Sequence, residues 1–309
     1  MLAYTRQMTR ITILAGGSSS ERAVSLRSGA AVQTALTSAG YDATIVDPAQ
    51  PGDEYDSLVR SADVVFITLH GSGGEDGSIQ SWLEERQQRY IGCDSAVSAI
   101  CFDKWRYKEA LRTANIRTPQ GELVDRQAFL ASPLSHRPFV LKPYDGGSSV
   151  DTFIIRDPAD YDSSVVLASF ERHERMLLEE LVIGQELTAG VLIDGALPIV
   201  EIVPPTDGEF DYENKYNGRT RELCPPESLS LDIQTAAQKL ALDIHKFVGA
   251  RDMSRTDMIA TESGELYVLE TNTIPGLTDQ SLFPKAAAAA GFDMPTLVTK
   301  LVESARNRR

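Results

Sequence analysis

Residues 255–272, near the end of the chain, contain one arginine and four acids whose spacing could bring several of them together. Apolar runs lie on both sides of Ser263-Gly264, a pattern that predicts a β-hairpin with a two-residue turn. Counting back from that turn, and applying the alternation of side chains along a strand, brings four polar groups to one face. These groups are Arg255, Asp257, Glu270 and Asn272, with Asp257 directly opposite Glu270.

Two carboxylates in opposite positions on neighbouring strands indicate a bound cation. Their Cβ atoms would lie roughly 4.5–5.5 Å apart, and like charges that close repel unless a positive group lies between them. Carboxylate and amide oxygens suit Mg²⁺, which leaves coordination positions open for phosphate. The alternative is an exposed hairpin with solvated acids, which would result if a bulge shifted the register. Nearer the turn, the predicted register pairs Ile259 with Val268 and Glu262 with Glu265.

Two lysines and a loop of small residues could bind phosphate. Lys142 ends an apolar strand and precedes Gly146-Gly-Ser-Ser149, a loop whose backbone N–H groups can approach an anion closely. Lys104 lies in a predicted helix. Taken singly, the loop could be an ordinary turn and Lys104 an exposed surface lysine.

Other glycine-rich and acidic segments could likewise be either binding sites or ordinary connectors and surface residues. The segment from His70 to Gly77 follows an apolar strand, so its N–H groups could hold an anion, or it could be a simple connector. Ser20 is expected to cap the first helix. The pair Gly16-Gly17 lacks the G-x-G-x-x-G spacing of a dinucleotide-binding fold. Three acids near the end of a later strand could accept hydrogen bonds from an adenine amine or ribose hydroxyls, or be solvated: Glu179, Glu180 and Glu186.

Strands and helices alternate along the first hundred residues. Strands are predicted at residues 12–15, 43–47 and 63–69, and helices at 20–40 and 78–86. This alternation favours a parallel α/β sheet, in which the loops after the strands bind ligands.

A second unit is predicted from Cys101 onward. Its predicted elements are a helix at 103–114, strands at 139–143, 152–155 and 175–182, a hairpin made of 187–193 and 197–203, and helices at 229–248 and 295–306. Residues 204–226 form a long polar segment, which is typical of a functional lid or of disorder.

The composition limits the partners and the compartment. The 309 residues carry a net charge of −14, so nucleic acid and anionic membrane are poor partners. The three cysteines have no zinc spacing, which fits free thiols in a reducing compartment. No apolar stretch is long enough to cross a membrane and no signal-peptide pattern is present, so a cytoplasmic location is expected. Met8 could be the true start.

Together, and in this order, these segments resemble the ATP-grasp superfamily and, within it, the D-alanine–D-alanine ligases. The resemblance covers nearly the whole chain. The motifs that carry it are Gly16-Gly17 with Ser20-Glu21-Arg22-Ala-Val-Ser25, His70-Gly71 with Gly74-Glu75-Asp76-Gly77, Asp103-Lys104, Lys142-Pro143 with Gly147-Ser-Ser-Val150, Asp211-Tyr212-Glu-Asn-Lys215-Tyr216, and Glu270-Thr-Asn272-Thr-Ile-Pro275-Gly276-Leu-Thr278 with Ser281-Leu282.

The resemblance implies a fold and a reaction. The fold would be α/β (α+β), an ATP-grasp fold with a parallel-sheet domain at 1–100 and two α+β domains, at 101–186 and 187–309, that enclose the nucleotide. ATP would phosphorylate the carboxylate of one D-alanine, and the amine of a second would attack the acyl phosphate to give D-alanyl-D-alanine for peptidoglycan precursors. Two Mg²⁺ ions would take part, with Mn²⁺ a possible substitute. A cytoplasmic homodimer is expected.

The resemblance also implies roles for single residues. The nucleotide contacts would be Lys104, Lys142, Glu179, Val182, Glu186 and Lys215, and the metal ligands Asp257, Glu270 and Asn272. The substrate contacts would be His70, Ser281 and Leu282. The first ammonium would be bound by Glu21, which Ser148 and Tyr216 would hold in place. The oxyanion would be stabilised by Arg255 and the backbone N–H of Gly276.

Two departures from the family pattern affect the fine detail of the sites. Asp151 stands where many members have glycine, and Gln280 where a histidine is common. Relatives that make D-alanyl-D-lactate tend to lack Tyr216, so the resemblance implies an amine rather than a hydroxy acid as the second substrate. The alternatives are another ATP-dependent carboxylate–amine ligase with different amino acids, an inactive ATP-binding homologue, and a dinucleotide oxidoreductase.

Overall fold

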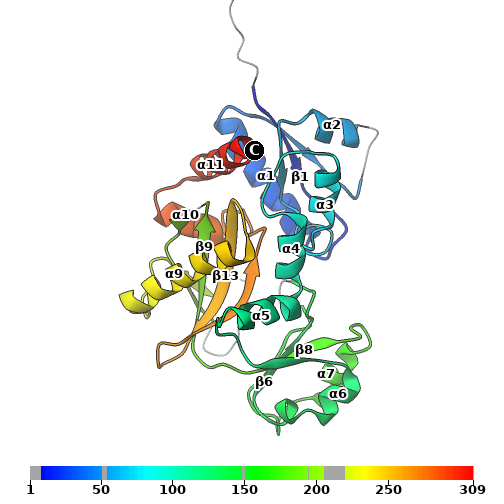
Figure 1. Ribbon diagram of the computed structural model, residues 1–309, viewed down its shortest axis with the longest axis vertical. Helices are drawn as coiled ribbons and strands as arrows, with labels where there is room; N and C mark the ends of the chain where they lie inside the picture. The colour runs from blue at the N-terminus through cyan, green and yellow to red at the C-terminus, as the bar shows by residue number, and fades with distance from the viewer. Residues whose placement is uncertain (1–7, 51–53, 148–149, 194, 205–219, 309) are drawn as a thin grey trace, which may run out of the picture.

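The computed structural model describes residues 8–50, 54–147, 150–193, 195–204 and 220–308. Three β-sheets are arranged along the long axis of the molecule (Figure 1). The chain forms the first sheet at one end, continues to the second sheet at the other end, and then builds the third sheet between them. Its last helix returns to pack beside the first sheet.

The first sheet is parallel, with strand order β2-β1-β3-β4. Its strands are β1 (Arg10–Leu14), β2 (Asp42–Val46), β3 (Val64–Ile67) and β4 (Tyr90–Ile91), and the helices beside it are α1 (Arg22–Ser38), α2 (Tyr55–Ser61) and α3 (Ser78–Glu85). The central strands β1 and β3 are nearly continuous runs of buried residues, as expected where helices cover both faces. The predicted parallel sheet is confirmed.

The first helix begins later than predicted. It starts at Arg22 with Glu21 in the N-cap position, so the prediction of Ser20 as the cap is wrong. The turn before the helix is fixed from the loop after β3 instead. Ser19 Oγ donates to the carbonyl of His70 at 2.6 Å and accepts from the backbone N–H of Glu21 at 3.2 Å.

Two helices, α4 (Ser95–Phe102) and α5 (Lys104–Thr113), carry the chain away from the first sheet. Only Asp103 separates them. Its carboxylate caps α5 by accepting a hydrogen bond from the backbone N–H of Arg106 at 3.0 Å. Lys104 is therefore the first residue of α5, and Lys108 lies one turn further on the same side of the helix.

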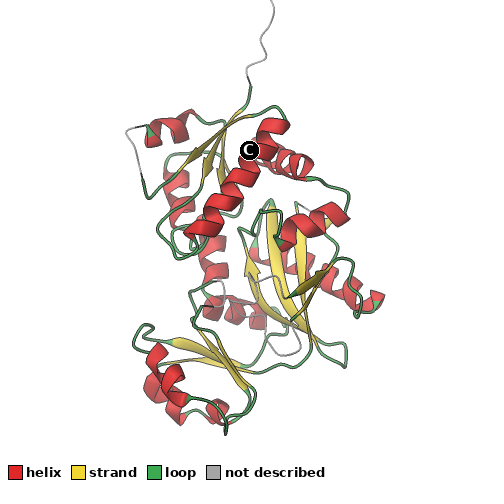
Figure 2. Ribbon diagram, turned by 180° about the vertical axis from the view of Figure 1, so that it is seen from behind, coloured by secondary structure: helices red, strands yellow, loops and turns green. Residues whose placement is uncertain are grey.

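The second sheet is antiparallel, with strand order β5-β8-β6-β7. Its elements are β5 (Gly121–Val124), α6 (Arg126–Ala131), the 3₁₀ helix η1 (Pro133–His136), β6 (Phe139–Lys142), β7 (Phe153–Ile155), α7 (Ser163–Ser169) and β8 (Met176–Glu180). Phe129, Phe139 and Val166 belong to the core that these elements share. The helices lie on the side of this sheet that faces away from the third sheet (Figure 2).

The third sheet is also antiparallel, with strand order β12-β11-β9-β13-β14 and with β10 paired to β9. Its strands are β9 (Gln185–Leu192), β10 (Gly195–Ala196), β11 (Val200–Val203), β12 (Arg221–Leu223), β13 (Met253–Ala260) and β14 (Leu266–Asn272), and the helices that follow them are α9 (Leu231–Val248) and α10 (Leu282–Ala289). The predicted pairing of 187–193 with 197–203 is confirmed by β9 and β11. The last helix, α11 (Met294–Asn307), packs against α1. Among the described helices, none is long and apolar enough to cross a membrane.

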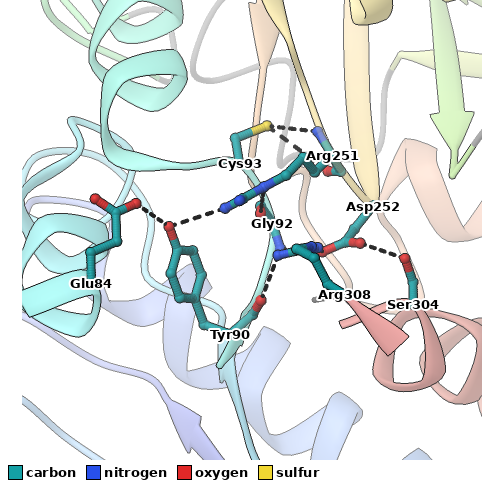
Figure 3. A network of polar contacts seen from close by, with 8 residues as sticks. All are labelled: Glu84, Tyr90, Gly92, Cys93, Arg251, Asp252, Ser304 and Arg308. Carbon is teal, nitrogen blue, oxygen red and sulfur yellow. Dashed lines mark hydrogen bonds and ion pairs between the residues drawn. The ribbon is translucent and has the colours of Figure 1, made fainter. Parts of the chain in front are cut away.

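A buried polar cluster joins the first sheet, the start of β13 and the last helix (Figure 3). Asp252 accepts hydrogen bonds from the backbone N–H of Gly92 and the hydroxyl of Ser304, both at 2.7 Å, and it forms an ion pair with Arg308. Arg251 donates to the carbonyl of Gly92 at 3.1 Å. Because β13 begins at the next residue, this cluster sets where that strand starts relative to the first sheet.

Candidate active site

The acidic hairpin has the predicted partners at its charged end. β13 and β14 pair Arg255 with Asn272 and Asp257 with Glu270. Asp257 and Glu270 are therefore direct cross-strand neighbours, and both line the same cavity. The predicted opposition of these two acids is confirmed.

Near the turn, the predicted pairs are wrong. The observed pairs are Ile259–Tyr267 and Thr261–Glu265, in place of Ile259–Val268 and Glu262–Glu265. The turn is one residue longer than predicted, and a bulge opposite the step from Asp257 to Met258 adds one residue to β14. The two differences cancel, so the register returns to the predicted one where the acids lie.

Asp257 is held from two sides within the sheet. Its carboxylate accepts two hydrogen bonds from the guanidinium of Arg255, at 2.9 and 2.8 Å, and one from the hydroxyl of Thr188 at 2.5 Å. The bidentate pair fixes the orientation of both side chains. Although burial acts against the charged form, the carboxylates of Asp257 and Glu270 raise the pKa of Arg255 above its ordinary value, so this group is a permanent cation.

Two predicted lysines, one on α5 and one on the second sheet, each lie close to an acidic side chain of the cavity wall. Lys104 Nζ lies 3.3 Å from Glu270 Oε2, and it also donates to the carbonyl of Gly146. Lys142 Nζ lies 2.8 Å from Glu179 Oε2. The two lysine side chains are only 10% and 12% exposed. Their charges therefore act through a medium of lower dielectric than water, where their attraction for a phosphate is stronger.

A cavity of about 700 Å³ lies between the second and third sheets. This volume is in the range of small-molecule and cofactor sites. Most of the predicted nucleotide and metal residues are on its wall, namely Lys104, Lys142, Glu179, Val182, Glu186, Asp257 and Glu270.

The wall of this cavity also has apolar surface from both sheets. Val140, Phe153 and Ile155 come from the second sheet, and Ile202 and Ile259 come from the third. Apolar side chains on two facing sheets suit a flat aromatic ring such as a nucleobase, and the charged cluster suits its phosphates. The cavity thus has both surfaces that a nucleoside triphosphate needs.

Glu21 lies where two glycine loops approach each other. A Cβ atom at Gly71 or at Gly147 would lie 2.8 Å from Glu21 Oε2. Gly71 follows β3 and Gly147 follows β6, so the carboxylate lies between a loop of the first sheet and a loop of the second. The absence of a side chain at these two glycines leaves the space that the carboxylate occupies.

His70 is buried at the end of the first sheet. It is 6% exposed, and its Nε2 lies 3.2 Å from Ser28 Oγ. Burial and, next, the positive charge of Arg255 lower the pKa of His70 to about 4, so the ring is neutral near pH 7. A neutral ring can accept or donate one hydrogen bond beside a substrate without adding charge.

The predicted contacts Gly276, Ser281 and Leu282 lie after β14. A Cβ atom at Gly276 would lie 2.8 Å from Ser281 Oγ, so these residues are adjacent. The loop also reaches His70, because Ser28 Oγ accepts from the backbone N–H of Leu277 at 3.4 Å. Leu282 is the first residue of α10 and packs against the core shared by the first and third sheets.

Asn272 is placed beside the cavity that holds the two acids. It lines a smaller cavity of about 40 Å³, which shares Lys104 and Glu270 with the larger one. Its Oδ1 accepts from the backbone N–H of Ile274 at 2.8 Å. Across the described ranges, no group of three or more His, Cys, Asp or Glu side chains could hold a metal ion. The candidate donor set is therefore two carboxylates and one amide, and these hard oxygen donors fit Mg²⁺ shared with phosphate.

Three predicted residues, Ser148, Lys215 and Tyr216, lie outside the described residues. The two positions that depart from the family pattern, Asp151 and Gln280, do lie within the described residues. Asp151 has φ +52°, forms an ion pair with Arg172 at 2.6 Å and lies within hydrogen-bond distance, 2.8 Å, of His173 Nε2. Gln280 is exposed.

Two buried ionisable residues near the site were not among the predicted ones. Glu75 accepts a hydrogen bond from the backbone N–H of Gly71 at 2.7 Å, and burial followed by the charge of Glu21 raises its pKa to about 8. Lys108 is fully buried and forms an ion pair with Glu179. The only sequence signal for Lys108 is its position four residues after Lys104, which puts both on one side of α5.

The sequence matches two described families in the order of the chain. Residues 47–93 match "D-ala D-ala ligase N-terminus" and residues 120–303 match "D-ala D-ala ligase C-terminus". A D-alanine–D-alanine ligase of Nitrosomonas europaea is 37% identical over 302 residues, covering 97% of this chain and 98% of the relative. One of Dechloromonas aromatica is 39% identical over 306 residues, covering 96% and 98%.

A solved structure agrees with these matches. The D-alanine–D-alanine ligase of Bacillus anthracis, complexed with ATP, superimposes with a TM-score of 0.81 at 30% identity, over 96% of this chain and 97% of that one. The matches in sequence and in structure both extend over nearly the full length of this chain. This chain therefore belongs to the D-alanine–D-alanine ligase family.

Proposed function

We propose that this chain joins two D-alanine molecules into D-alanyl-D-alanine with ATP, through an acyl phosphate, as a step towards peptidoglycan precursors. The observation that supports this function most is the position of Asp257 opposite Glu270 on the wall of a cavity that Lys104 and Lys142 also line. A carboxylate and ATP are both anions, so their reaction needs a cluster of opposite charge at the phosphoryl group.

The nucleotide would lie between the second and third sheets. Lys104 and Lys142 would bind its phosphates, with Lys215 as a further contact. Val182 would offer backbone groups to the adenine, while Glu179 and Glu186 would complete the adenosine side.

The residues that would hold two Mg²⁺ ions, or Mn²⁺ in their place, are Asp257, Glu270 and Asn272. When bound, such ions neutralise the charge of the phosphoryl group that is transferred. Arg255, fixed by its bidentate pair with Asp257, would stay in place as a cation beside the reacting carboxyl group. With the backbone N–H of Gly276, it would stabilise the tetrahedral oxyanion formed when the second amine attacks.

The amino-acid substrates would lie between the first and third sheets. Glu21 would bind the ammonium of the first D-alanine, with Ser148 and Tyr216 holding Glu21. His70 is neutral and close to the loop that carries Gly276, so it would contact the first substrate without competing with that ammonium for Glu21. Ser281 and Leu282 would bind the second D-alanine.

We propose the following organisation for the whole molecule. The domains would be residues 1–100, 101–186 and 187–309, and the protein would act as a cytoplasmic homodimer. The net charge of −14 makes nucleic acid an unfavourable partner. A native molecular-mass measurement tests the dimer, and a mass equal to one chain would contradict it.

The experiment that tests the function is incubation with ATP, Mg²⁺ and D-alanine, followed by identification of the product by mass. We expect D-alanyl-D-alanine together with ADP and phosphate, and no condensation product with L-alanine or D-lactate. Turnover only with other amino acids would identify a different carboxylate–amine ligase. ATP binding without turnover on any amino acid would indicate an inactive homologue.

A further inference from the structure

Three charged side chains form a row that runs from the wall of the cavity into the protein interior. Lys108 on α5 is 0% exposed, and Glu179 on β8 is 1% exposed. Lys108 forms an ion pair with Glu179 Oε1, while Lys142 on β6 lies 2.8 Å from Glu179 Oε2. One buried carboxylate therefore has a separate lysine on each of its oxygens.

The row continues to the acidic hairpin. Lys108 Nζ donates to Thr118 Oγ1 at 2.9 Å, and Thr118 Oγ1 donates to the carbonyl of Val268 at 2.8 Å. The backbone N–H of Val268 in turn donates to the carbonyl of Arg117 at 2.9 Å. Val268 lies on β14, two residues before Glu270. Lys108 therefore connects β8, which bears Glu179, to the strand that bears Glu270.

The two lysines of the row lie in different surroundings. Lys142 lines the cavity, whereas Lys108 is buried behind it. Burial lowers the pKa of Lys108 to about 8 in spite of Glu179, while for Lys142 the attraction of Glu179 and Glu270 outweighs burial and raises the pKa. At pH 7 the row holds two positive charges and one negative, and the excess positive charge is on the lysine that faces the cavity.

We infer that Lys108 is a positioning residue: it neutralises Glu179 from behind, so that Lys142 keeps its charge for the phosphates, and it fixes the second sheet to the acidic hairpin. Without Lys108, Lys142 is the one lysine left of the row to balance the buried carboxylate of Glu179. Removing one partner leaves a buried charge that only the remaining partner can compensate. Lys142, which already pairs with Glu179, would then be held there more tightly and would be less available to a phosphate in the cavity.

This inference rests on the proposed function, because it takes the ligand of the cavity to be a nucleoside triphosphate. The unmodified protein is therefore measured first. If it neither binds ATP nor turns over with D-alanine, the proposed function fails. If it does both and the variants below behave as the unmodified protein does, only the role of Lys108 fails.

The test is Lys108→Met, which keeps the length of the side chain and removes its charge. We expect the KM for ATP to rise about 10- to 30-fold, since removing one partner of a buried charge pair has effects of that order. The KM for D-alanine should change less than about twofold, because the substrate residues belong to other loops. The control is Lys239→Met, whose side chain is 75% exposed on α9, and which should change neither constant.

A double variant separates this role from a structural one. In Lys108→Met/Glu179→Gln the buried negative charge is also absent, so Lys142 is no longer drawn back. We expect its KM for ATP to be within about threefold of that of Glu179→Gln alone. If Lys108 serves only the fold, its loss lowers the unfolding midpoint in both backgrounds, and the KM for ATP stays unchanged in the single variant. That result would overturn the inference.

A third variant covers the case in which Lys108→Met does not fold. Thr118→Val keeps Lys108 and its ion pair but removes the link to Val268. We expect a rise of several-fold in the KM for ATP with an unchanged KM for D-alanine. Equal changes in both constants, or none, would contradict the proposed connection to the hairpin.

Discussion

Asp257 and Glu270 are cross-strand neighbours, and each has a cation of its own: Arg255 for the first and Lys104 for the second. The opposed acids are thus compatible with one another inside a largely buried site. Carboxylate oxygens can accept several partners, so both acids can also bind a divalent ion that is shared with phosphate.

Removing one of the opposed acids tests the metal assignment. We expect Asp257→Asn and Glu270→Gln to lower kcat by about 100-fold or more, because charge stabilisation by a bound metal is worth several kcal/mol. Phosphate release at saturating ATP measures this loss, and raising the Mg²⁺ concentration should restore part of it. The matched control is Glu262→Gln, at the exposed turn of the same hairpin. Near-normal turnover at ordinary Mg²⁺ would show that these acids are not metal ligands.

Gly147→Ala tests the position of Glu21. Its new methyl group would lie 2.8 Å from Glu21 Oε2, so the carboxylate has to move. We expect the apparent KM for the first D-alanine to rise about 10-fold or more, since small displacements of a binding group have effects of this order. Initial rates over a range of D-alanine concentrations measure it. Gly195→Ala, where the nearest atom is 3.7 Å away, is the control. An unchanged KM would place Glu21 outside the substrate site.

The buried His70 predicts how stability depends on pH. Its pKa is about 4 in the folded chain, against 6.5 for an unperturbed histidine. Between these values the unfolded chain binds more protons, so stability falls as the pH is lowered from 6.5 towards 4 and is unaffected above that window. Between pH 7.5 and pH 5 this group alone should remove about 2 kcal/mol. Urea unfolding of the unmodified protein and of His70→Gln should show a smaller loss in the variant. Equal losses would mean that His70 is not buried as a neutral ring.

The cluster around Asp252 predicts a contribution to stability rather than to chemistry. The Asp252 side chain is 1% exposed and accepts bonds from Gly92 and Ser304 while it pairs with Arg308. Asp252→Leu removes all of these contacts and leaves the buried backbone N–H of Gly92 without its acceptor, so we expect a loss of about 3 kcal/mol or more in the free energy of unfolding.

The control for that measurement is another acid in an ion pair. Asp243, paired with Lys239, is 51% exposed, and Asp243→Leu should cost less than about 1 kcal/mol. Urea denaturation at pH 7 compares the two. Similar losses would mean that the cluster does not fasten the first sheet to β13.

The sequence predicted the charged end of the hairpin better than the rest of it. Alternation along the strands placed Asp257 opposite Glu270, but the turn length and the bulge were both missed, and the result was right because they compensate. Neither the longer turn nor the bulge changes the hydrophobic pattern enough to be recognised from a single sequence. Short helices such as α2 and α7 were missed for a related reason, because seven residues are too few to show a helical period.

Buried charges were the other limit of sequence reasoning. Lysine is almost never fully buried unless it is paired, so Lys108 reads as an exposed residue of α5. Its pairing with Glu179 depends on how the second sheet packs against the helix, which is a long-range property. Glu21 was expected at the start of a helix, yet the space for its carboxylate is made by glycines from two other loops.

The most direct measurement follows the oxygen atoms of the first substrate. D-alanine labelled with heavy oxygen in its carboxylate is incubated with ATP and Mg²⁺, and the released phosphate and the dipeptide are analysed by mass. We predict that each phosphate carries one labelled oxygen, because the carboxylate attacks the γ-phosphorus and loses that oxygen when the second amine displaces phosphate. Formation of D-alanyl-D-alanine with unlabelled phosphate would contradict the acyl-phosphate route, and the absence of dipeptide would contradict the proposed reaction itself.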